Sequence, residues 1–325
     1  MSLKKAVECI RKNKTFLITA HTNLEGDALG SELAFYFLLE ALGKRATIVN
    51  EDNLPYGYDF LPDLSKIIKY KDNLKGIKFD CFAILDCSGM KRCGEVYRLN
   101  KNNKPVLNID HHISNENFGN VNWIEPHASS CCEMIYKIYK KMSVPITQSG
   151  ALCLYVGMLT DTGSFRYSNT SGFVHKAVSE LIGYGLDPAE IYKNIYSRVP
   201  YQDMKILADI LPKMHLRANG KLVWFEIPRR ALKDKSVSFD LGESILNFGR
   251  SIKDVEVVVL FKENMGLKNE IRINFRSQGE VDVNKIASCF GGGGHRTASA
   301  CTMHASLSEA RRRVLKKIEE VIANK

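Results

Sequence analysis

Short apolar segments alternate with polar loops along the first half of the chain. Each of four short apolar runs predicts a buried strand: residues 15–20, 46–50, 80–87 and 104–109. A strongly apolar helix is predicted over residues 28–42, with Gly43 as its C-cap, and a second buried helix over residues 148–160. Strands that alternate with helices in this way are typical of βαβ units and a parallel sheet.

The pattern changes after residue 187. A polar, helical stretch with prolines at positions 200 and 212 predicts a linker over residues 188–213. Beyond it, the periodicity predicts strands and one helix: strands at 221–227, 255–261 and 270–276, and a helix at 241–252. We therefore expect an α/β protein with a parallel-sheet first domain, residues 1–187, and a smaller mixed α/β second domain, residues 214–325. The active site is expected in the cleft between them.

Length and composition agree with two ordinary globular domains. The chain has 325 residues, of which 45% are hydrophobic and 25% charged. Because no apolar run has signal-peptide length or approaches the ~18 residues of a membrane span, we expect neither feature. The nine cysteines are scattered without a Cys-x-x-Cys pair, which predicts reduced thiols in a cytoplasmic protein.

The chain is basic, with a formal net charge of +10. Such an excess favours an anionic ligand, for example a phosphoester or a nucleic acid. A lysine-rich solvated surface explains the charge equally well, because many of the lysines fall in loops such as residues 66–78. The charge alone therefore leaves both interpretations open.

Acidic and imidazole side chains follow the apolar elements of the first domain. They are His21, Glu25 and Asp27 after the first strand, Asp86 after the third, Asp110, His111 and His112 after the fourth, and Asp161 at the end of the second helix. The carboxyl ends of parallel strands meet at one edge of a sheet, where α/β proteins bind ligands. One such residue alone would be a helix cap or a solvated turn, but the recurrence predicts a shared site.

Metal binding is the chemistry that this set of side chains suits best. Two imidazole nitrogens and four carboxylate groups favour Mn²⁺, with Mg²⁺ or Fe²⁺ as alternatives, over structural zinc or calcium. Two ions that share one bridging carboxylate would need about this many groups, and two-metal sites serve in-line displacement at phosphorus. Adjacent side chains point apart, so we expect Asp110 to orient a neighbour and one of the two histidines to face substrate.

The second domain offers an anion-binding candidate of its own. Apolar and polar residues alternate in the strand at 270–276, so one face carries the guanidinium groups of Arg272 and Arg276. Downstream of them comes the run Gly291, Gly292, Gly293, Gly294, His295 and Arg296. Consecutive glycines leave backbone amides bare for a phosphate or a base. We expect a substrate-anion cradle here; a flexible loop is the alternative.

Taken together, these motifs resemble those of DHH-superfamily phosphoesterases. In the first domain the matching segments are His21 with Asp27-Ala-x-Gly-Ser, Asp86-Cys-Ser, Asp110-His111-His112 and Asp161-Thr-Gly-Ser-Phe-Arg. In the second they are Arg272-Ile-x-x-Arg276-Ser and Asp282-Val-Asn-Lys285-Ile-Ala, followed by the glycine run with His295 and Arg296, which resemble the DHH-associated C-terminal domain. The two-domain layout is similar to the stand-alone branch that degrades nanoRNA and dephosphorylates 3′-phosphoadenosine 5′-phosphate (pAp).

The resemblance implies a role for each matching residue. Two Mn²⁺ ions would be bound by two groups of residues that share Asp86. The first group is His21, Glu25 and Asp86, and the second is Asp27, Asp86, His111 and Asp161. Asp110 would support His112, which would face the scissile phosphate, and a hydroxide activated by the two metals would attack phosphorus. Arg272, Arg276 and His295 would grip a short RNA or nucleotide substrate.

One position departs from the family pattern. The family usually has Asn-Pro-Asp-Gly-Asp where this chain has Asn23-Leu24-Glu25-Gly26-Asp27. Glutamate keeps the carboxylate but adds a methylene, which leaves open a nucleotide-binding regulatory module with an altered metal site. A cyclic or linear dinucleotide phosphodiesterase and a RecJ-like single-strand exonuclease are the enzymatic alternatives. The preferred substrate, the direction of digestion and the oligomeric state stay open, with a homodimer among the alternatives.

Overall fold

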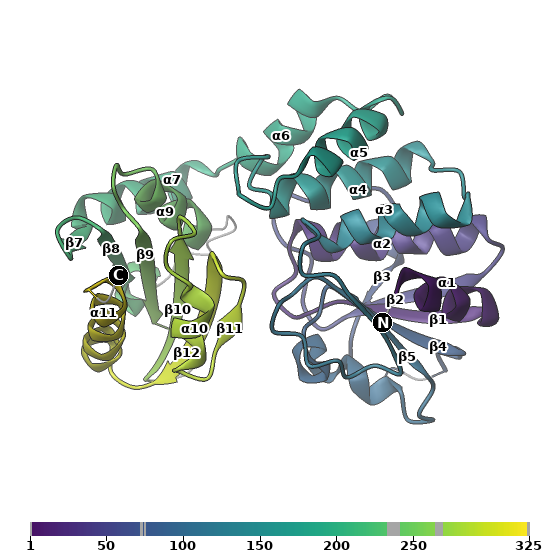
Figure 1. The fold of residues 1–325 in the computed structure, drawn as a ribbon, viewed down its shortest axis with the longest axis horizontal. Helices are drawn as coiled ribbons and strands as arrows, with labels where there is room; N and C mark the ends of the chain where they lie inside the picture. Colours follow the sequence, from purple (N-terminus) through teal and green to yellow (C-terminus); the bar gives the residue numbers. More distant parts are fainter. Residues whose placement is uncertain (1, 72–73, 75, 233–240, 264–268, 324–325) are drawn as a thin grey trace. The chain divides into compact units, whose positions relative to one another are not determined.

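The computed structural model describes residues 2–71, 74, 76–232, 241–263 and 269–323. The chain forms two compact units, Met1–Arg198 and Val199–Lys325, which are described separately (Figure 1). The boundary between them falls inside the segment 188–213, between helices α6 (Pro188–Tyr196) and α7 (Tyr201–Ile210). No helix in these described residues is long and apolar enough to cross a membrane.

The first unit contains a parallel six-stranded sheet with the strand order β3-β2-β1-β4-β5-β6. Its strands are β1 (Thr15–Thr19), β2 (Arg45–Asn50), β3 (Ile67–Lys69), β4 (Cys81–Leu85), β5 (Val106–Asp110) and β6 (Val121–Ile124). Its α-helices, besides α6, are α1 (Leu3–Lys12), α2 (Gly26–Ala41), α3 (Cys131–Met142), α4 (Gln148–Asp161) and α5 (Gly172–Ile182). The four predicted strands and two predicted helices are confirmed to within two residues at each end.

The strand order places a topological switch point in the middle of this sheet. From β1 the chain moves to β2 and β3 on one side, and it then returns to β4 on the other side of β1. At such a point the crossovers diverge and leave a crevice at the carboxyl ends of the two strands. The residues that follow β1 and β4 therefore border the position where an open α/β sheet binds its ligand.

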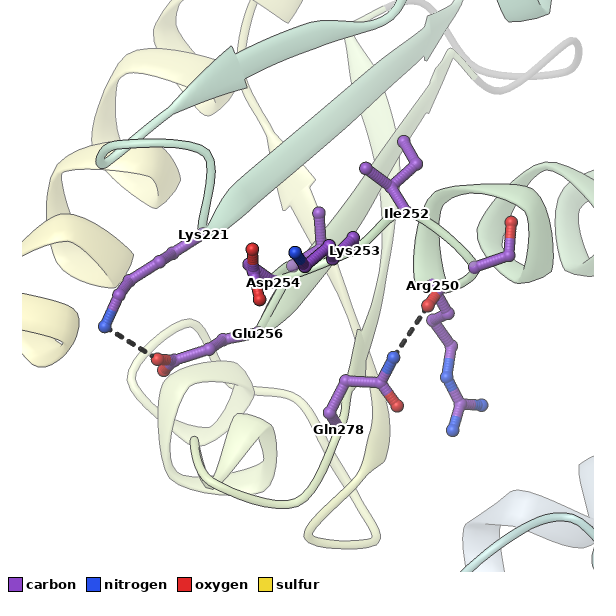
Figure 2. A pocket seen from close by; sticks show the side chains of 9 residues that line it. Lys221, Arg250, Ile252, Lys253, Asp254, Glu256 and Gln278 are labelled. Carbon is purple, nitrogen blue, oxygen red and sulfur yellow. Dashed lines mark hydrogen bonds and ion pairs between the residues drawn. The ribbon is translucent and has the colours of Figure 1, made fainter.

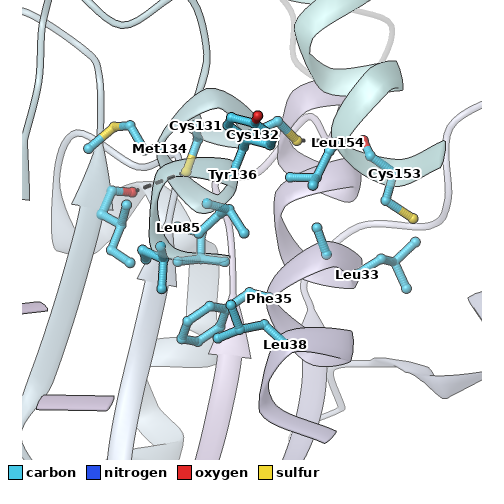
Figure 3. Packing of buried hydrophobic residues seen from close by; sticks show 14 of the residues in the cluster. Leu33, Phe35, Leu38, Leu85, Cys131, Cys132, Met134, Tyr136, Cys153 and Leu154 are labelled. Atoms are coloured by element: carbon cyan, nitrogen blue, oxygen red, sulfur yellow. Dashed lines mark hydrogen bonds between the residues drawn. The ribbon is translucent and has the colours of Figure 1, made fainter. Parts of the chain in front are cut away.

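Helices α2 and α4 approach each other closely on one face of the sheet, with α3 packed beside them. Figure 3 shows this apolar layer, in which Leu33 of α2, Tyr136 of α3 and Leu154 of α4 are buried. Glycines permit the close approach. A Cβ atom added to Gly30 would lie 2.5 Å from the carbonyl oxygen of Cys153, and one added to Gly157 would lie 2.6 Å from Oδ1 of Asp27.

A buried polar network lies between α2 and the sheet. The Asn50 side chain donates to Oε2 of Glu32 at 2.7 Å, and the Thr19 hydroxyl donates to Oδ1 of Asn50 at 3.2 Å. Oε1 of Glu32 is buried and has no hydrogen-bond partner among the described residues. Burial raises the pKa of Glu32 from its ordinary value of 4.5 to about 8, so this acid is mostly protonated at neutral pH.

The second unit contains a mixed six-stranded sheet with the order β11-β12-β10-β9-β8-β7; among the described strands the β8–β9 pair is parallel and the other pairs are antiparallel. Its strands are β7 (His215–Arg217), β8 (Leu222–Ile227), β9 (Val257–Glu263), β10 (Glu270–Ser277), β11 (Gly293–Gly294) and β12 (Ala298–His304). Its α-helices, besides α7, are α8 (Arg229–Leu232), α9 (Leu241–Arg250), α10 (Val283–Ser288) and α11 (Leu307–Ala323). The predicted mixed α/β second domain is confirmed.

Helices cover both faces of this sheet. Residues of α7 and α9 form one apolar cluster with β8 and β9, and residues of α10 and α11 form another on the opposite face. A pocket of about 670 Å³ lies near the end of α9, where the side chain of Gln278 donates to the carbonyl oxygen of Arg250 at 2.6 Å (Figure 2). The pocket contains none of the site residues predicted from the sequence.

The close contact between α2 and α4 predicts a stability effect. Gly30→Ala should lower the free energy of unfolding by about 1–3 kcal/mol, because its methyl group would meet a helix backbone that cannot move aside easily. Gly172→Ala is the matched control, since a Cβ atom there has no neighbour within 4 Å. Urea denaturation followed by circular dichroism measures both changes, and equal stabilities of the two variants would contradict the packing argument.

The raised pKa of Glu32 predicts how stability depends on pH. Between pH 4.5 and about 8 the folded chain keeps a proton that the unfolded chain has lost, so this group makes stability fall as pH rises, by at most about 1.4 kcal/mol per pH unit. Glu32→Gln should remove the contribution of this group to the pH dependence of the free energy of unfolding. Urea denaturation from pH 5 to 8, after chelation of metal, tests this; parallel curves for the two proteins would refute it.

Candidate metal centre

The carboxyl ends of three neighbouring strands bring the predicted site residues of the first unit together. Three groups of side chains each place their ligand atoms within 4.8 Å of one another: His21, Glu25 and Asp86; Asp27, Asp86 and His111; Asp86, Asp110 and His112. Asp86 belongs to every one of these groups. It therefore occupies the position that a carboxylate bridging two cations would need.

Backbone carbonyls orient two of the histidines. Nδ1 of His21 lies 2.7 Å from the carbonyl oxygen of Thr22, and Nδ1 of His111 lies 3.2 Å from that of Ala128. A carbonyl only accepts, so Nδ1 of each ring carries a hydrogen, and Nε2 is the ring nitrogen that faces the cluster. The two Nε2 atoms lie 3.3 and 3.4 Å from the oxygens of Asp86. Both imidazoles therefore direct a ring nitrogen toward the shared carboxylate of Asp86.

Asp86 is held in an unusual and costly state. Its φ of 48° lies in the left-handed region, which non-glycine residues rarely occupy. The residue is 1% exposed, and Nε2 of His111 and Nδ1 of His112 lie 3.4 and 3.5 Å from its Oδ1. Burial alone would raise the pKa of Asp86, but hydrogen bonds from His111 and His21 outweigh it and hold the pKa well below its ordinary range. A buried anion at the centre of several metal-competent side chains suits a cation.

The start of helix α3 fixes the carboxylate of Asp27. The backbone amides of Cys131 and Cys132 donate to its Oδ2 and Oδ1 at 2.6 and 2.9 Å. The first amides of a helix have no partner within the helix and favour a negative charge. Oδ2 of the same carboxylate lies 3.8 Å from Nε2 of His111. Asp27 therefore joins α3 to the centre of the site.

The carboxylates are too crowded to be ionised together without a cation. Burial, followed by the charges of Asp161 and Asp86, raises the pKa of Glu25 well above its ordinary value. Burial, followed by the charges of Asp86 and Asp161, does the same to the pKa of Asp27. Divalent cations would supply the missing positive charge, and the mixed imidazole and carboxylate donors fit a first-row ion such as Mn²⁺. The residues present therefore fit a divalent metal ion.

Asp110 is hydrogen-bonded to His112. Its Oδ1 accepts from Nδ1 of His112 at 2.6 Å and from the backbone amide of His111 at 2.8 Å. Its Oδ2 accepts from the side chain of Asn115 at 2.6 Å. Since both oxygens are used, the carboxylate is suited to hold the His112 ring at a fixed angle.

Glu25, where the chain departs from the family pattern, has two interactions. It is the N-cap residue of α2, and its Oε1 accepts from the backbone amide of Ala28 at 3.3 Å. It also reaches the group formed with His21 and Asp86. The longer side chain therefore does not remove the carboxylate from the site.

The residues predicted to bind substrate lie on one sheet of the second unit. Arg272 and Arg276 project from the same face of β10, and Arg276 pairs with Glu243 of α9 at 2.5 Å. His295 is in the turn that joins β11 to β12, where its backbone amide donates to the carbonyl of Ala298. Nε of Arg296 donates to the carbonyl oxygen of Gly279 at 3.1 Å, so this side chain turns toward the loop after β10.

The glycine run is not the open amide loop expected from the sequence. The amides of Gly291 and Gly292 donate to carbonyl oxygens at the end of α10, and Gly293 and Gly294 form β11 against β12. The prediction of bare amides is therefore wrong for the first two glycines. Glycine is required here for close approach, because a Cβ atom on Gly292 would lie 2.2 Å from the carbonyl oxygen of Ala300.

Sequence reasoning missed the groups that position the ligands. Asn115 and the amides of Cys131 and Cys132 hold Asp110 and Asp27, yet they belong to no motif. Asn108 belongs to the same support, since its side chain donates to the carbonyls of Ile84 and Cys87. A polar Asn108 inside an otherwise apolar strand was the one available signal, because a buried amide needs partners.

Comparison with known proteins agrees with this geometry. The model of the DHH family, N-terminal domain, matches residues 15–158, and the model of the DHHA1 domain matches residues 233–324. A Thermus thermophilus protein named bifunctional oligoribonuclease and PAP phosphatase NrnA is 29% identical over 309 residues, which are 93% of this chain and 89% of that protein. A Streptococcus mutans protein with the same name, marked as probable, is 26% identical over 95% of each chain.

A solved structure supports the fold over the whole length. An exopolyphosphatase-related protein from Bacteroides fragilis superposes with a TM-score of 0.88 at 24% identity, covering 99% of this chain and 97% of that one. The two family models together span well over half of the chain, and they match most of the unit with the buried His and Asp cluster and most of the unit with the mixed sheet. The chain is therefore a DHH-family phosphoesterase that carries a DHHA1 domain.

Proposed function

We propose that this protein is a Mn²⁺-dependent hydrolase of short oligoribonucleotides, of pAp, or of both. The observation that carries the proposal is the buried donor set centred on Asp86, in which oriented imidazoles and crowded carboxylates meet. Full-length relatives bear the name oligoribonuclease and PAP phosphatase, which supports these substrates among the phosphoesters. A cytoplasmic location stays a prediction from the sequence.

Two groups of residues would hold the ions. One is His21, Glu25 and Asp86, and the other is Asp27, Asp86, His111 and Asp161, with Asp86 shared. When bound, two divalent ions supply a water of lowered pKa and positive charge for the phosphate. Oriented by the short hydrogen bond to Asp110, the His112 ring would donate from Nε2 to a phosphate oxygen whenever that nitrogen is protonated.

The second unit would bind the anionic substrate. It carries 22 of the 46 Lys and Arg residues but 15 of the 36 Asp and Glu residues, so most of the net positive charge belongs to it. Arg272, Arg276 and His295 would contact phosphate groups, for which a guanidinium offers paired donors. The absence of side chains at Gly292, Gly293 and Gly294 would let the substrate come close to the sheet, and Arg296 would stabilise the turn that follows.

A substrate panel with Mn²⁺ tests the proposal. We expect pApA, an RNA 5-mer and pAp to be hydrolysed with a kcat/KM at least tenfold above that for a 24-mer, cyclic di-AMP or pyrophosphate. His111→Ala should lower kcat by more than about 100-fold, since removal of a ligand should exceed the ~10–100-fold cost of losing a supporting group. Preference for cyclic di-AMP or the 24-mer would overturn the substrate assignment.

A binding module without catalysis would give a different result. It would bind pAp, hydrolyse no member of the panel and retain fewer than two Mn²⁺ ions per chain. Metal analysis of the purified protein therefore accompanies the panel. Two ions with no turnover of any substrate would refute the hydrolase proposal while leaving the metal site in place.

Glu25 provides a second test, because it is the one altered ligand position. Glu25→Ala should lose one of two Mn²⁺ ions and most of the activity, whereas Glu25→Asp should keep both ions with a shifted affinity, since the loop is adapted to the longer side chain. Isothermal titration with Mn²⁺ beside pApA turnover measures both. If Glu25→Ala bound two ions and turned over at the parent rate, Glu25 would not be a ligand.

A further inference from the structure

The face of the second sheet that packs against α7 and α9 is apolar at β8 and β9 but polar at β10. Leu260 of β9 is buried in the cluster formed with α7 and α9. In register with it on β10 is Asn274, which shares this face and is partly exposed. Its neighbours on the same strand face are Arg272 and Arg276. On this face the apolar side chains of β9 are therefore followed by the polar side chains of Arg272, Asn274 and Arg276 on β10.

The residues beside Asn274 on this face of the sheet are small, and together they form what we call the low floor. Its cross-strand partner on β12 is Ala300, and the partner of Ala300 on β11 is Gly293. One methyl group and one hydrogen therefore lie where other residues would project a side chain. Alternate residues on a strand are roughly 7 Å apart, so this low floor lies between two guanidinium groups.

The two flanking arginines are held by other residues. Nη1 of Arg272 donates to the hydroxyl of Thr302 at 3.2 Å, and Nη2 of Arg276 pairs with Oε2 of Glu243 at 2.5 Å. The carboxamide of Asn274 differs from both, because it makes no hydrogen bond to any described residue. A donor and an acceptor are therefore available above the low floor.

We propose that Asn274 hydrogen-bonds the substrate ribose and so makes the second unit selective for ribonucleotides over deoxyribonucleotides. This inference rests on the proposed function. Phosphates bound at Arg272 and Arg276 would be joined through a sugar, as in a nucleoside 3′,5′-bisphosphate or an internal nucleotide. That sugar would then lie over Ala300 with its 2′-hydroxyl, donor and acceptor at once, facing the carboxamide. Asn274 is thus a specificity residue that touches the sugar and not the reacting phosphate.

Asn274→Ala tests the inference with pApA and its fully deoxy analogue in the presence of Mn²⁺. We expect KM for pApA to rise about tenfold, as for one lost hydrogen bond, and kcat to change less than twofold. KM for the deoxy analogue should stay the same, so that the preference for ribose falls about tenfold. Asn274→Ser keeps a hydroxyl and should recover part of the preference.

Gln278→Ala is the matched control, because it removes a carboxamide from the same unit at the pocket of Figure 2, where Gln278 bonds the carbonyl of Arg250. It should leave the ribose preference unchanged. Isothermal titration with pAp and 2′-deoxy-pAp gives the same comparison without turnover. The Kd ratio therefore tests Asn274 even if pApA is not hydrolysed.

Two results would overturn the inference. One is an Asn274→Ala variant whose ribose preference stays within twofold of the parent in both KM and Kd. The other is a variant that changes the preference between pApA and pUpU but not between ribose and deoxyribose, which would assign Asn274 to the base. Continued hydrolysis of pApA in either case would leave the proposed function intact.

Discussion

Attraction between the Asp86 carboxylate and the imidazoles of His21 and His111 is the interaction on which the first unit's site depends. Asp86 is almost fully buried, and its backbone adopts a left-handed conformation that costs of order 1–3 kcal/mol. Burial of an anion is unfavourable unless positive charge and hydrogen bonds surround it. The two rings, held by carbonyls of Thr22 and Ala128, provide part of that compensation, and cations would provide the rest.

The close packing of helices α2, α3 and α4 places Asp27 beside this cluster. Asp27 reaches the site only because the small residues Gly30 and Gly157 let α2 and α4 approach, and because α3 begins where its amides meet the carboxylate. Bulky side chains at those glycines would push the helices apart and move Asp27. Residues that never touch substrate thus determine where the ligand atoms lie.

The sequence was sufficient for the longer elements and for the meeting of acidic and imidazole side chains at one edge of the first sheet, but not for the short strands or for the groups that hold those side chains. Elements such as α2 and β10 have clear periodicity over whole segments, and the site residues recur at strand ends. By contrast, β3 and β7 have three residues each, and β12 reads as Ala-Ser-Ala-Cys-Thr-Met-His, whose small side chains give little hydrophobic contrast. Register with β10 and tertiary contacts decide such strands.

The supports escaped prediction for a different physical reason. A backbone amide such as that of Cys131 has no sequence signature, since every residue except proline has one, and its use depends on where a helix begins in space. The pairing of Arg276 with Glu243 likewise depends on the packing of α9 against the sheet. The sequence thus shows which side chains are candidate ligands, whereas the three-dimensional fold determines how those side chains are oriented.

The two groups of proposed ligands come from segments as distant as His21 and Asp161, so a pair of bound ions would act as a cross-link. Through the shared Asp86, the pair would tie the ends of β1, β4 and β5 to both α2 and α4, much as a disulfide ties distant parts of a secreted domain. Ion binding to the folded state alone adds stability in proportion to the logarithm of ion concentration. Metal supply in the cell would then govern how long the folded protein survives as well as how fast it works.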